Sequence, residues 1–186
     1  DILKLKITWY WFYTIINTAK LGYMSCRFMI KLKNVSFEKE QEIIDYFKKK
    51  KLGVKLIFIV EKEPLGTGGW MHLLTEEQRK DFNKDFIVVN GDDLFEIDWD
   101  KMHAQHKATK ALITMALVQV EDTSKFGVAE LDGNLIKRFV EKPLPEDAPS
   151  HYVSGGHYIF SKKIFDEIPG QARFMTEHDL FPKIAE

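Results

Sequence analysis

Short apolar runs alternate with amphipathic segments along most of the chain. The apolar runs predict strands at residues 26–32, 54–60, 86–90 and 111–118. Between them, residues 38–49 place apolar side chains on one helical face, and a helix is expected from Asp98 to about His106. Strands that alternate with helices in this way favour an α/β protein with a mainly parallel sheet covered by helices. The run at 86–90 is almost wholly apolar, which is typical of a central strand buried on both faces.

After Val120 the pattern changes to that of an antiparallel hairpin. Two alternating runs, at residues 127–131 and 135–140, flank Asp-Gly-Asn at 132–134. Asp-Gly between such runs predicts a β-hairpin, because glycine accepts a positive φ without steric cost. The segments that follow are predicted as a strand and two helices, at residues 152–160, 162–168 and from 176.

A strongly apolar stretch lies near the N-terminus, at residues 7–16. It is far shorter than the ~20 residues that a membrane helix needs. It also lacks the small-residue cleavage site of a signal peptide. Its large apolar side chains recur at helical spacing and Gly22 stands where a helix would be capped, so a buried helix is predicted here.

Composition limits the kinds of partner. The 186 residues suit a single domain, 1–186, and the 27 Lys and Arg balance 28 Asp and Glu. This balance provides no net field to attract nucleic acid or an anionic membrane, so any phosphate must be bound by local groups. The one cysteine, Cys26, cannot form an internal disulfide, which favours a cytoplasmic location and a buried structural thiol.

Candidate chemistry lies in the connections between the predicted elements. Residues 63–69, Glu-Pro-Leu-Gly-Thr-Gly-Gly, join an expected strand to an expected helix, and their glycines let backbone groups approach a flat ligand or a phosphate. The segment is neither a Walker A loop nor the dinucleotide fingerprint, and a structural glycine turn is the alternative. Asp92 and Asp93 follow the strand at 86–90, at the sheet edge where open α/β sheets bind ligands. A carboxylate there suits Mg²⁺, and a turn or helix-cap aspartate is the alternative.

Three smaller features complete the candidates. Glu141 offers an acceptor for sugar hydroxyls and Lys142 offers a charge for a phosphate, although a surface pair of this kind is commonly just solvated. The glycines at 155–156 leave room for a ligand against their strand. His103 and His106 are three residues apart on the expected helix with no third ligand nearby, so they are predicted as surface or edge residues and not as a metal site.

The order and spacing of these segments resemble those of sugar-1-phosphate nucleotidylyltransferases, nearest to mannose-1-phosphate guanylyltransferase-like enzymes. The resemblance runs from about Leu21 to Glu186 and rests on PLGTGG, VNGDD, DTSKFGVAELDGNLIKRFVEKP, YVSGGHYIFSKKIF and FPKIAE in that order. It implies a Rossmann-like (GT-A-like) mixed, mainly parallel sheet flanked by helices, with a β-hairpin insertion. It further implies that a nucleoside monophosphate passes from a nucleoside triphosphate, with GTP favoured, to a sugar 1-phosphate, with Mg²⁺ as cofactor.

The resemblance also implies roles for individual residues. The residues implied to read the base are Leu65, Gly66 and Thr67. The residues implied to contact the sugar are Gly127, Glu141, Ser154 and Gly156. Gly91 would lie close to the nucleoside, Asp92 would bind the catalytic Mg²⁺, and Lys142 would reach the sugar phosphate as the second catalytic residue. Ser154 stands where the family more often has asparagine, and Asp93 is given no direct role.

Two parts of the family pattern are not found in the sequence. The first 21 residues contain no glycine, so the family's N-terminal glycine-rich triphosphate loop is not expected in them, and the family's second metal-binding aspartate would lie beyond Glu186. Three explanations stay open: the middle of an ordinary enzyme, which is favoured, a truncated chain, or a regulatory paralogue that binds nucleotide-sugars without making them. A glycosyltransferase of similar fold is disfavoured, because it would usually carry Asp-x-Asp where Asp92 and Asp93 are adjacent. The expected partners are a nucleoside triphosphate and a sugar 1-phosphate, without nucleic acid or membrane, and homo-oligomerisation is left open.

Overall fold

The computed structural model describes residues 12–17, 27–32, 37–49, 55–90 and 96–185, and describes side chains from residue 41 onward within these ranges, except that of Lys55. Its strands are β1 (Phe12–Asn17), β2 (Arg27–Leu32), β3 (Lys55–Val60), β4 (Phe86–Asn90), β5 (Ile113–Gln119), β6 (Gly127–Asp132), β7 (Leu135–Glu141) and β8 (Tyr152–Phe160). Its α-helices are α1 (Phe37–Lys48), α2 (Trp70–Leu73), α3 (Glu76–Lys80), α4 (Trp99–Thr109) and α5 (Phe181–Ala185). Two short 3-10 helices, η2 (Pro145–Asp147) and η3 (Lys162–Asp166), and a π-helical turn, η4 (Thr176–Leu180), complete the list.

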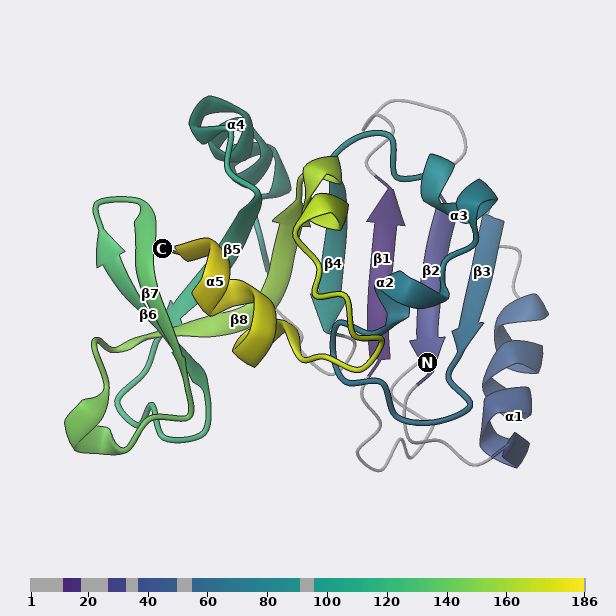
Figure 1. Cartoon of the computed structure of the whole chain (residues 1–186), viewed down its shortest axis with the longest axis horizontal. Coiled ribbons are helices and arrows are strands. Elements are labelled where there is room, and N and C mark those ends of the chain that lie inside the picture. The colour runs from purple at the N-terminus through teal and green to yellow at the C-terminus, as the bar shows by residue number, and fades with distance from the viewer. Residues whose placement is uncertain (1–11, 18–26, 33–36, 50–54, 91–95, 186) are drawn as a thin grey trace.

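The strands form one mixed sheet in the order β3-β2-β1-β4-β8-β6-β7, with β5 paired to β8 (Figure 1). The registers make β2 parallel to β3, while β1 is antiparallel to both β2 and β4, and β8 is antiparallel to both β4 and β5. It follows that β2, β3, β4 and β5 all run in one direction, as the alternation of strands and helices predicts. The α/β class is confirmed, but fewer neighbouring strands are parallel than expected, because β1 and β8 lie between members of the parallel set.

The helix predicted near the N-terminus is wrong where the structure describes it. Residues Phe12–Asn17 form β1, and this strand pairs with β2 on one side and β4 on the other. Aromatic and β-branched residues such as those of β1 suit a pleated sheet. A place between two strands also gives the backbone hydrogen-bond partners on both sides, which outweighs a short helical periodicity. The rest of the stretch, and Cys26, lie outside the described residues.

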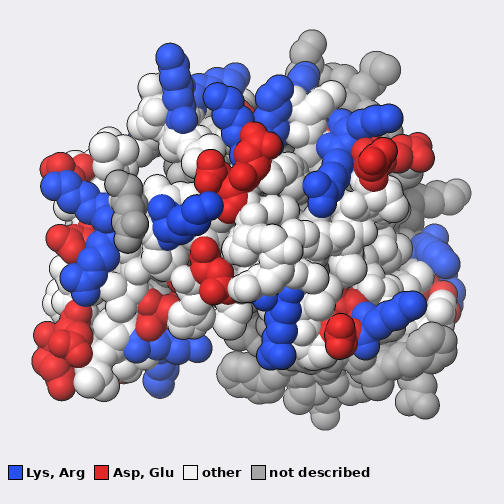
Figure 2. All heavy atoms as spheres, viewed as in Figure 1, with Lys and Arg blue, Asp and Glu red and all other residues white. Residues whose placement is uncertain are grey.

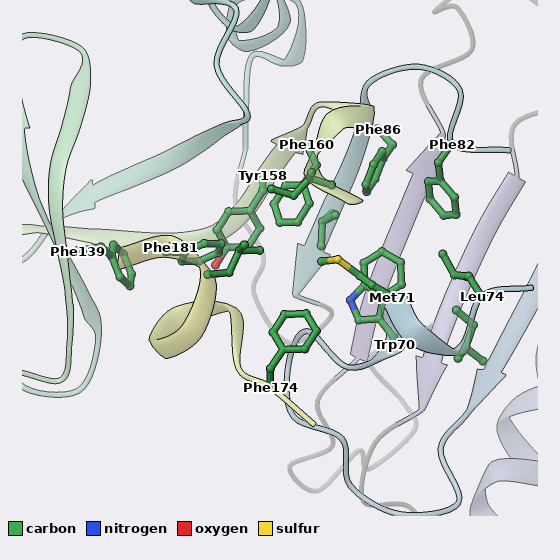
Figure 3. Close-up of a cluster of buried hydrophobic side chains, with 14 of the residues drawn as sticks. Trp70, Met71, Leu74, Phe82, Phe86, Phe139, Tyr158, Phe160, Phe174 and Phe181 are labelled. Atoms are coloured by element: carbon green, nitrogen blue, oxygen red, sulfur yellow. The ribbon is translucent and has the colours of Figure 1, made fainter. Parts of the chain in front are cut away.

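A series of aromatic contacts links the central strand β4 to the hairpin that β6 and β7 form at the end of the sheet (Figure 3). Ring centroids lie 5.7 Å apart between Phe86 and Phe160, and 5.9 Å apart between Phe160 and Tyr158. The series continues from Tyr158 to Phe181 at 5.4 Å, and from Phe181 to Phe139 of β7 at 5.3 Å. All five side chains are buried, and an aromatic pair contributes about 0.5–1.5 kcal/mol beyond its buried area. The hairpin is thereby held in a fixed position relative to the central strand β4.

Helix α4 begins at its cap, Asp98, whose side chain accepts a hydrogen bond from the Lys101 N–H at 2.9 Å. The prediction that His106 lies at the surface or an edge is wrong, since its exposed fraction is only 2%. Its Nδ1 lies 2.7 Å from the Thr114 hydroxyl of β5, and burial is the main cause of the lowered pKa of its imidazole. The packing of α4 against β5 therefore places this face of the helix inside the protein.

The charge of the surface and the length of the helices are relevant to the kinds of partner expected. Figure 2 shows acidic and basic side chains interspersed over the face that it draws. Among the helices in the described ranges, none has both the length and the apolar character required to cross a membrane.

Candidate functional site

The glycine loop at residues 65–69 is hydrogen-bonded to a segment from the far end of the chain, residues 174–177. The Phe174 N–H donates to the Leu65 carbonyl at 3.0 Å, and the Gly68 N–H donates to the Phe174 carbonyl at 3.1 Å. The Leu65 N–H donates to the Glu61 carboxylate at 3.3 Å, which fixes the entry to the loop. The loop therefore owes its position to two neighbours, the end of β3 and the approach to η4.

Phe174 explains why the loop needs glycine. Gly66 has a φ of +82°, and a Cβ there would lie 2.2 Å from the Phe174 carbonyl oxygen. A Cβ at Gly68 would lie 2.1 Å from a carbon of the Phe174 ring, which is itself buried. Both distances are shorter than van der Waals contact allows, so the close approach of these two segments requires the missing side chains.

The Thr67 hydroxyl is the centre of a buried hydrogen-bond network. Thr67 and Thr176 are each 5% exposed. The Thr67 Oγ1 accepts from the Thr176 N–H at 2.8 Å, lies 3.0 Å from the Thr176 Oγ1, and donates to the Glu177 carboxylate. A hydroxyl has one hydrogen to donate and two lone pairs. Because that hydrogen goes to Glu177, the Thr176 hydroxyl donates to Thr67, and every bonding position of the Thr67 hydroxyl is used.

Glu141 and Lys142 stand at the end of the hairpin. Gly127 is opposite Glu141 in the β6–β7 register, and a Cβ at Gly127 would lie 2.7 Å from the Glu141 Oε2. The glycine thus leaves space that the carboxylate uses. The Glu141 side chain is 12% exposed and that of Lys142 is 62% exposed, with 3.7 Å between Lys142 Nζ and Glu141 Oε1. Lys142 has a φ of +47° and its N–H donates to the Phe126 carbonyl at 2.9 Å, which fixes the turn from which its charge projects.

The electrostatics of Glu141 link the hairpin to the loop network. Burial is the main cause that raises the pKa of the Glu141 carboxyl, and the negative charge of Glu177 raises it further. The positive charges of Lys142 and His178 act in the opposite direction. Glu177 is therefore a neighbour both of Thr67 in the glycine loop and of Glu141 in the hairpin.

Ser154 and Gly156 lie in β8 and are engaged within that strand. The Ser154 hydroxyl lies 2.8 Å from the Tyr158 hydroxyl and accepts from the Gly156 N–H at 3.3 Å. Gly156 has a φ of +70°, in the region that favours glycine. The room expected beside the glycines at 155–156 is largely filled at Gly155, where a Cβ would lie 3.2 Å from the Ala116 carbonyl oxygen of β5. Contacts of Ser154 and Gly156 with a sugar stay predictions.

The structure brings together six of the predicted site residues, through the network around Glu177: Leu65, Gly66, Thr67, Gly127, Glu141 and Lys142. Gly91, Asp92 and Asp93 lie outside the described residues. Sequence reasoning missed Phe174 and Glu177. Glu177 follows the predicted helix start at Thr176, but its place in the sequence carries no sign of its partner 110 residues away.

The position before Gly91 carries a further polar group. Asn90 ends β4 and is 8% exposed, and no donor among the described residues reaches its buried Oδ1. An amide oxygen is a hard ligand of the kind that Mg²⁺ prefers. Within the described residues no group of three His, Cys, Asp or Glu side chains is arranged to hold a metal ion.

Comparisons with known proteins agree on one family. The sequence model described as "Nucleotidyl transferase" matches residues 27–185. The chain is 34% identical over 143 residues to the D-glycero-alpha-D-manno-heptose 1-phosphate guanylyltransferase of Campylobacter jejuni, which covers 76% of this chain and 60% of that protein. It is 31% identical over 134 residues to the mannose-1-phosphate guanylyltransferase of Mycobacterium tuberculosis, which covers 72% of this chain and 36% of that protein.

Solved structures give the same result for the fold. The crystal structure of HddC from Yersinia pseudotuberculosis complexed with GMP-PN matches with a TM-score of 0.60 and 29% identity, over 79% of this chain and 62% of that one. The chain thus spans about 60% or less of the length of relatives such as the Campylobacter and Mycobacterium proteins.

The mixed sheet with its helices and hairpin defines a Rossmann-like α/β protein. With a family match that extends from β2 to the last helix, the chain belongs to the nucleotidyl transferase family, as the order of its motifs predicts.

Proposed function

We propose that this chain carries the base-reading and sugar-phosphate parts of a cytoplasmic sugar-1-phosphate guanylyltransferase. The reaction joins GMP from GTP to a sugar 1-phosphate and releases pyrophosphate. The observation that carries the proposal is that Glu177 accepts a hydrogen bond from Thr67 of the glycine loop and also raises the pKa of Glu141 at the end of the hairpin. Support for guanine comes from the relatives, whose names include several guanylyltransferases.

The residues of the chain suit the transfer without a protein nucleophile. An oxygen of the sugar 1-phosphate attacks the α-phosphorus of GTP, the new oxygen–phosphorus bond forms, and the bond to the pyrophosphate oxygen breaks. Lys142, with its exposed ammonium group, would neutralise charge on the sugar phosphate. Glu141 would accept hydrogen bonds from sugar hydroxyls, while Leu65, Gly66 and Thr67 would present backbone groups to the base.

A divalent ion is part of the proposal. In this reaction Mg²⁺ would supply positive charge to the phosphates and help to orient them. Asp92 would hold the ion, and the Asn90 Oδ1, a buried oxygen with no donor among the described residues, is a second hard oxygen two positions earlier in the sequence. The Asn90 Oδ1 therefore offers one oxygen donor of the kind that suits the ion.

A pyrophosphate-release screen tests the proposal. Four nucleoside triphosphates are combined with several sugar 1-phosphates and Mg²⁺, with the Campylobacter jejuni relative as the positive control. The proposal expects release that requires GTP, one class of sugar 1-phosphate and the ion together. Binding of a GDP-sugar without any pyrophosphate release would instead identify a nucleotide-sugar-binding paralogue, and release with another triphosphate would overturn the choice of base.

A further inference from the structure

We propose that Glu177 is a positioning residue that holds the nucleotide loop through Thr67 and sets the charge beside Glu141, so that one carboxylate serves both substrate positions. This inference rests on the proposed function for its substrates.

The link to the loop is a hydrogen bond to a charged acceptor inside the protein. Thr67 is 5% exposed, so water cannot readily replace Glu177 as the acceptor of its hydroxyl hydrogen. Loss of this hydrogen bond would therefore cost stability. The Thr176 N–H and the Thr176 hydroxyl already occupy the lone pairs of the Thr67 Oγ1, which leaves Glu177 as the acceptor of its hydrogen. Removal of the Glu177 carboxylate therefore leaves the Thr67 hydroxyl hydrogen without its acceptor.

The backbone transmits this contact to the rest of the loop. Residues 65–68 are bonded to Phe174 by two backbone hydrogen bonds, and Glu177 lies only three residues beyond Phe174. A shift of Thr67 therefore changes the alignment of Gly66 and Gly68 against Phe174, where there is no spare room. Leu65, Gly66 and Thr67, to which the proposed function assigns the base, belong to this same loop.

The link to the hairpin is electrostatic, and it follows from the packing of η4, which carries Glu177, against β7, which carries Glu141. Glu177 opposes the ionisation of Glu141, whereas Lys142 and His178 favour it. Substitution of Glu177 by glutamine would keep an oxygen that accepts from Thr67 but remove this negative charge. Substitution by alanine would remove both. The two variants therefore separate the hydrogen bond from the charge.

Hydrogen exchange of the Gly68 amide tests the link between Glu177 and the loop without any substrate. We expect its protection to fall about tenfold in Glu177→Ala and in Thr67→Val, the loss expected for a hydrogen bond to a charged group. Glu177→Gln should stay within about twofold of the unmodified protein. Glu146→Gln, at an exposed carboxylate of η2, is the matched control.

Steady-state kinetics test the effect of Glu177 on the two substrates. We expect Glu177→Ala to raise the KM for GTP about tenfold, and Glu177→Gln to leave it within about twofold. Glu177→Gln should instead lower the KM for the sugar 1-phosphate about threefold and move the acidic limb of the pH profile of kcat/KM to lower pH, because a negative charge beside Glu141 and the incoming phosphate is gone.

The outcomes separate this inference from the proposed function. Unchanged exchange of Gly68 in both Glu177→Ala and Thr67→Val would overturn the positioning role, whether or not the protein releases pyrophosphate. Equal losses in Glu177→Gln and Glu177→Ala would overturn the division between hydrogen bond and charge. Altered exchange in a protein that releases no pyrophosphate would leave the positioning role standing and remove the proposed reaction.

Discussion

The ring of Phe174 occupies the space into which any side chain at Gly68 would project, with 2.1 Å between its nearest carbon and the position of a Cβ. A Gly68→Ala substitution should therefore push the loop and the 174–177 segment apart, at a cost of about 1–3 kcal/mol in the free energy of unfolding. Chemical denaturation measures this loss, and GTP binding should weaken with it. Gly170→Ala is the control, since nothing lies within 4 Å of a Cβ there. Equal stability of the two variants would contradict the packing argument.

Lys142 is the exposed cation at the end of the hairpin. A Lys142→Met substitution keeps the length of the side chain but removes its charge. We expect kcat/KM for the sugar 1-phosphate to fall about 10²-fold, the usual effect of removing one group that stabilises a charged transition state. Lys137→Met removes a cation of β7 whose Nζ pairs with Asp132 at 3.1 Å on the surface, and it should leave kcat/KM unchanged. Comparable losses in both variants would point to overall charge and not to Lys142.

The pH dependence of stability should carry a contribution from Glu141. Its pKa in the folded protein is raised above its ordinary value of 4.5 by burial and by Glu177. Between the unfolded and the folded pKa the folded state binds more protons, so stability falls as pH rises through this window. The free energy of unfolding of Glu141→Gln, relative to that of the unmodified protein, should therefore increase as pH rises through this window and stay constant above it. When Glu177 is also replaced by glutamine, this increase should be smaller. A relative free energy of unfolding that decreases as pH rises would contradict a raised pKa of Glu141.

Asp92 is implied by the family resemblance to bind Mg²⁺. An Asp92→Asn substitution should reduce Mg²⁺-dependent turnover by at least about 10²-fold, because the amide no longer offers a negative charge to the ion. It should change the free energy of unfolding little. Asp93→Asn, at the adjacent position to which the resemblance gives no direct role, should retain activity. Full Mg²⁺-dependent turnover in the Asp92 variant would remove the metal role.

Phe139 joins the hairpin to the aromatic series that leads to β4. It is 3% exposed, and its ring centroid lies 5.3 Å from that of Phe181. A Phe139→Ala substitution should cost about 3–5 kcal/mol in the free energy of unfolding, through lost burial and the cavity that remains. Leu135→Ala in the same strand changes a side chain that is 60% exposed, and it should change stability by less than about 0.5 kcal/mol. A small effect at Phe139 would show that the hairpin is not anchored through this ring.

The elements that sequence reasoning located well are those whose signal is local. The continuous apolar run at 86–90 predicts β4 at the residues that form it, and Asp132-Gly133 predicts the β6–β7 hairpin. The strand β1 is not predicted, because helical spacing over a few residues carries no signal of its place between β2 and β4 in the sheet.

The same distinction applies to the site. Sequence reasoning predicts Thr67 and Glu141 as site residues because each belongs to a short motif whose order and spacing resemble those of the family. Glu177 has no motif of its own, and its importance arises only from contacts with residues far away along the chain. Patterns of neighbouring residues cannot report a contact of this kind, whereas a folded structure does.

The dependence of the glycine loop on residues 174–177 also sets an order of events during synthesis. Thr67 leaves the ribosome 110 residues before its partner Glu177, an interval of about 5–20 s at ordinary translation rates. During this time β3 and α1 can already form, while the loop lacks Phe174 and the Thr176 N–H against which it is later shaped. The loop therefore reaches its final form only after residues 174–177 have been synthesised, later than the strand and the helix that precede it.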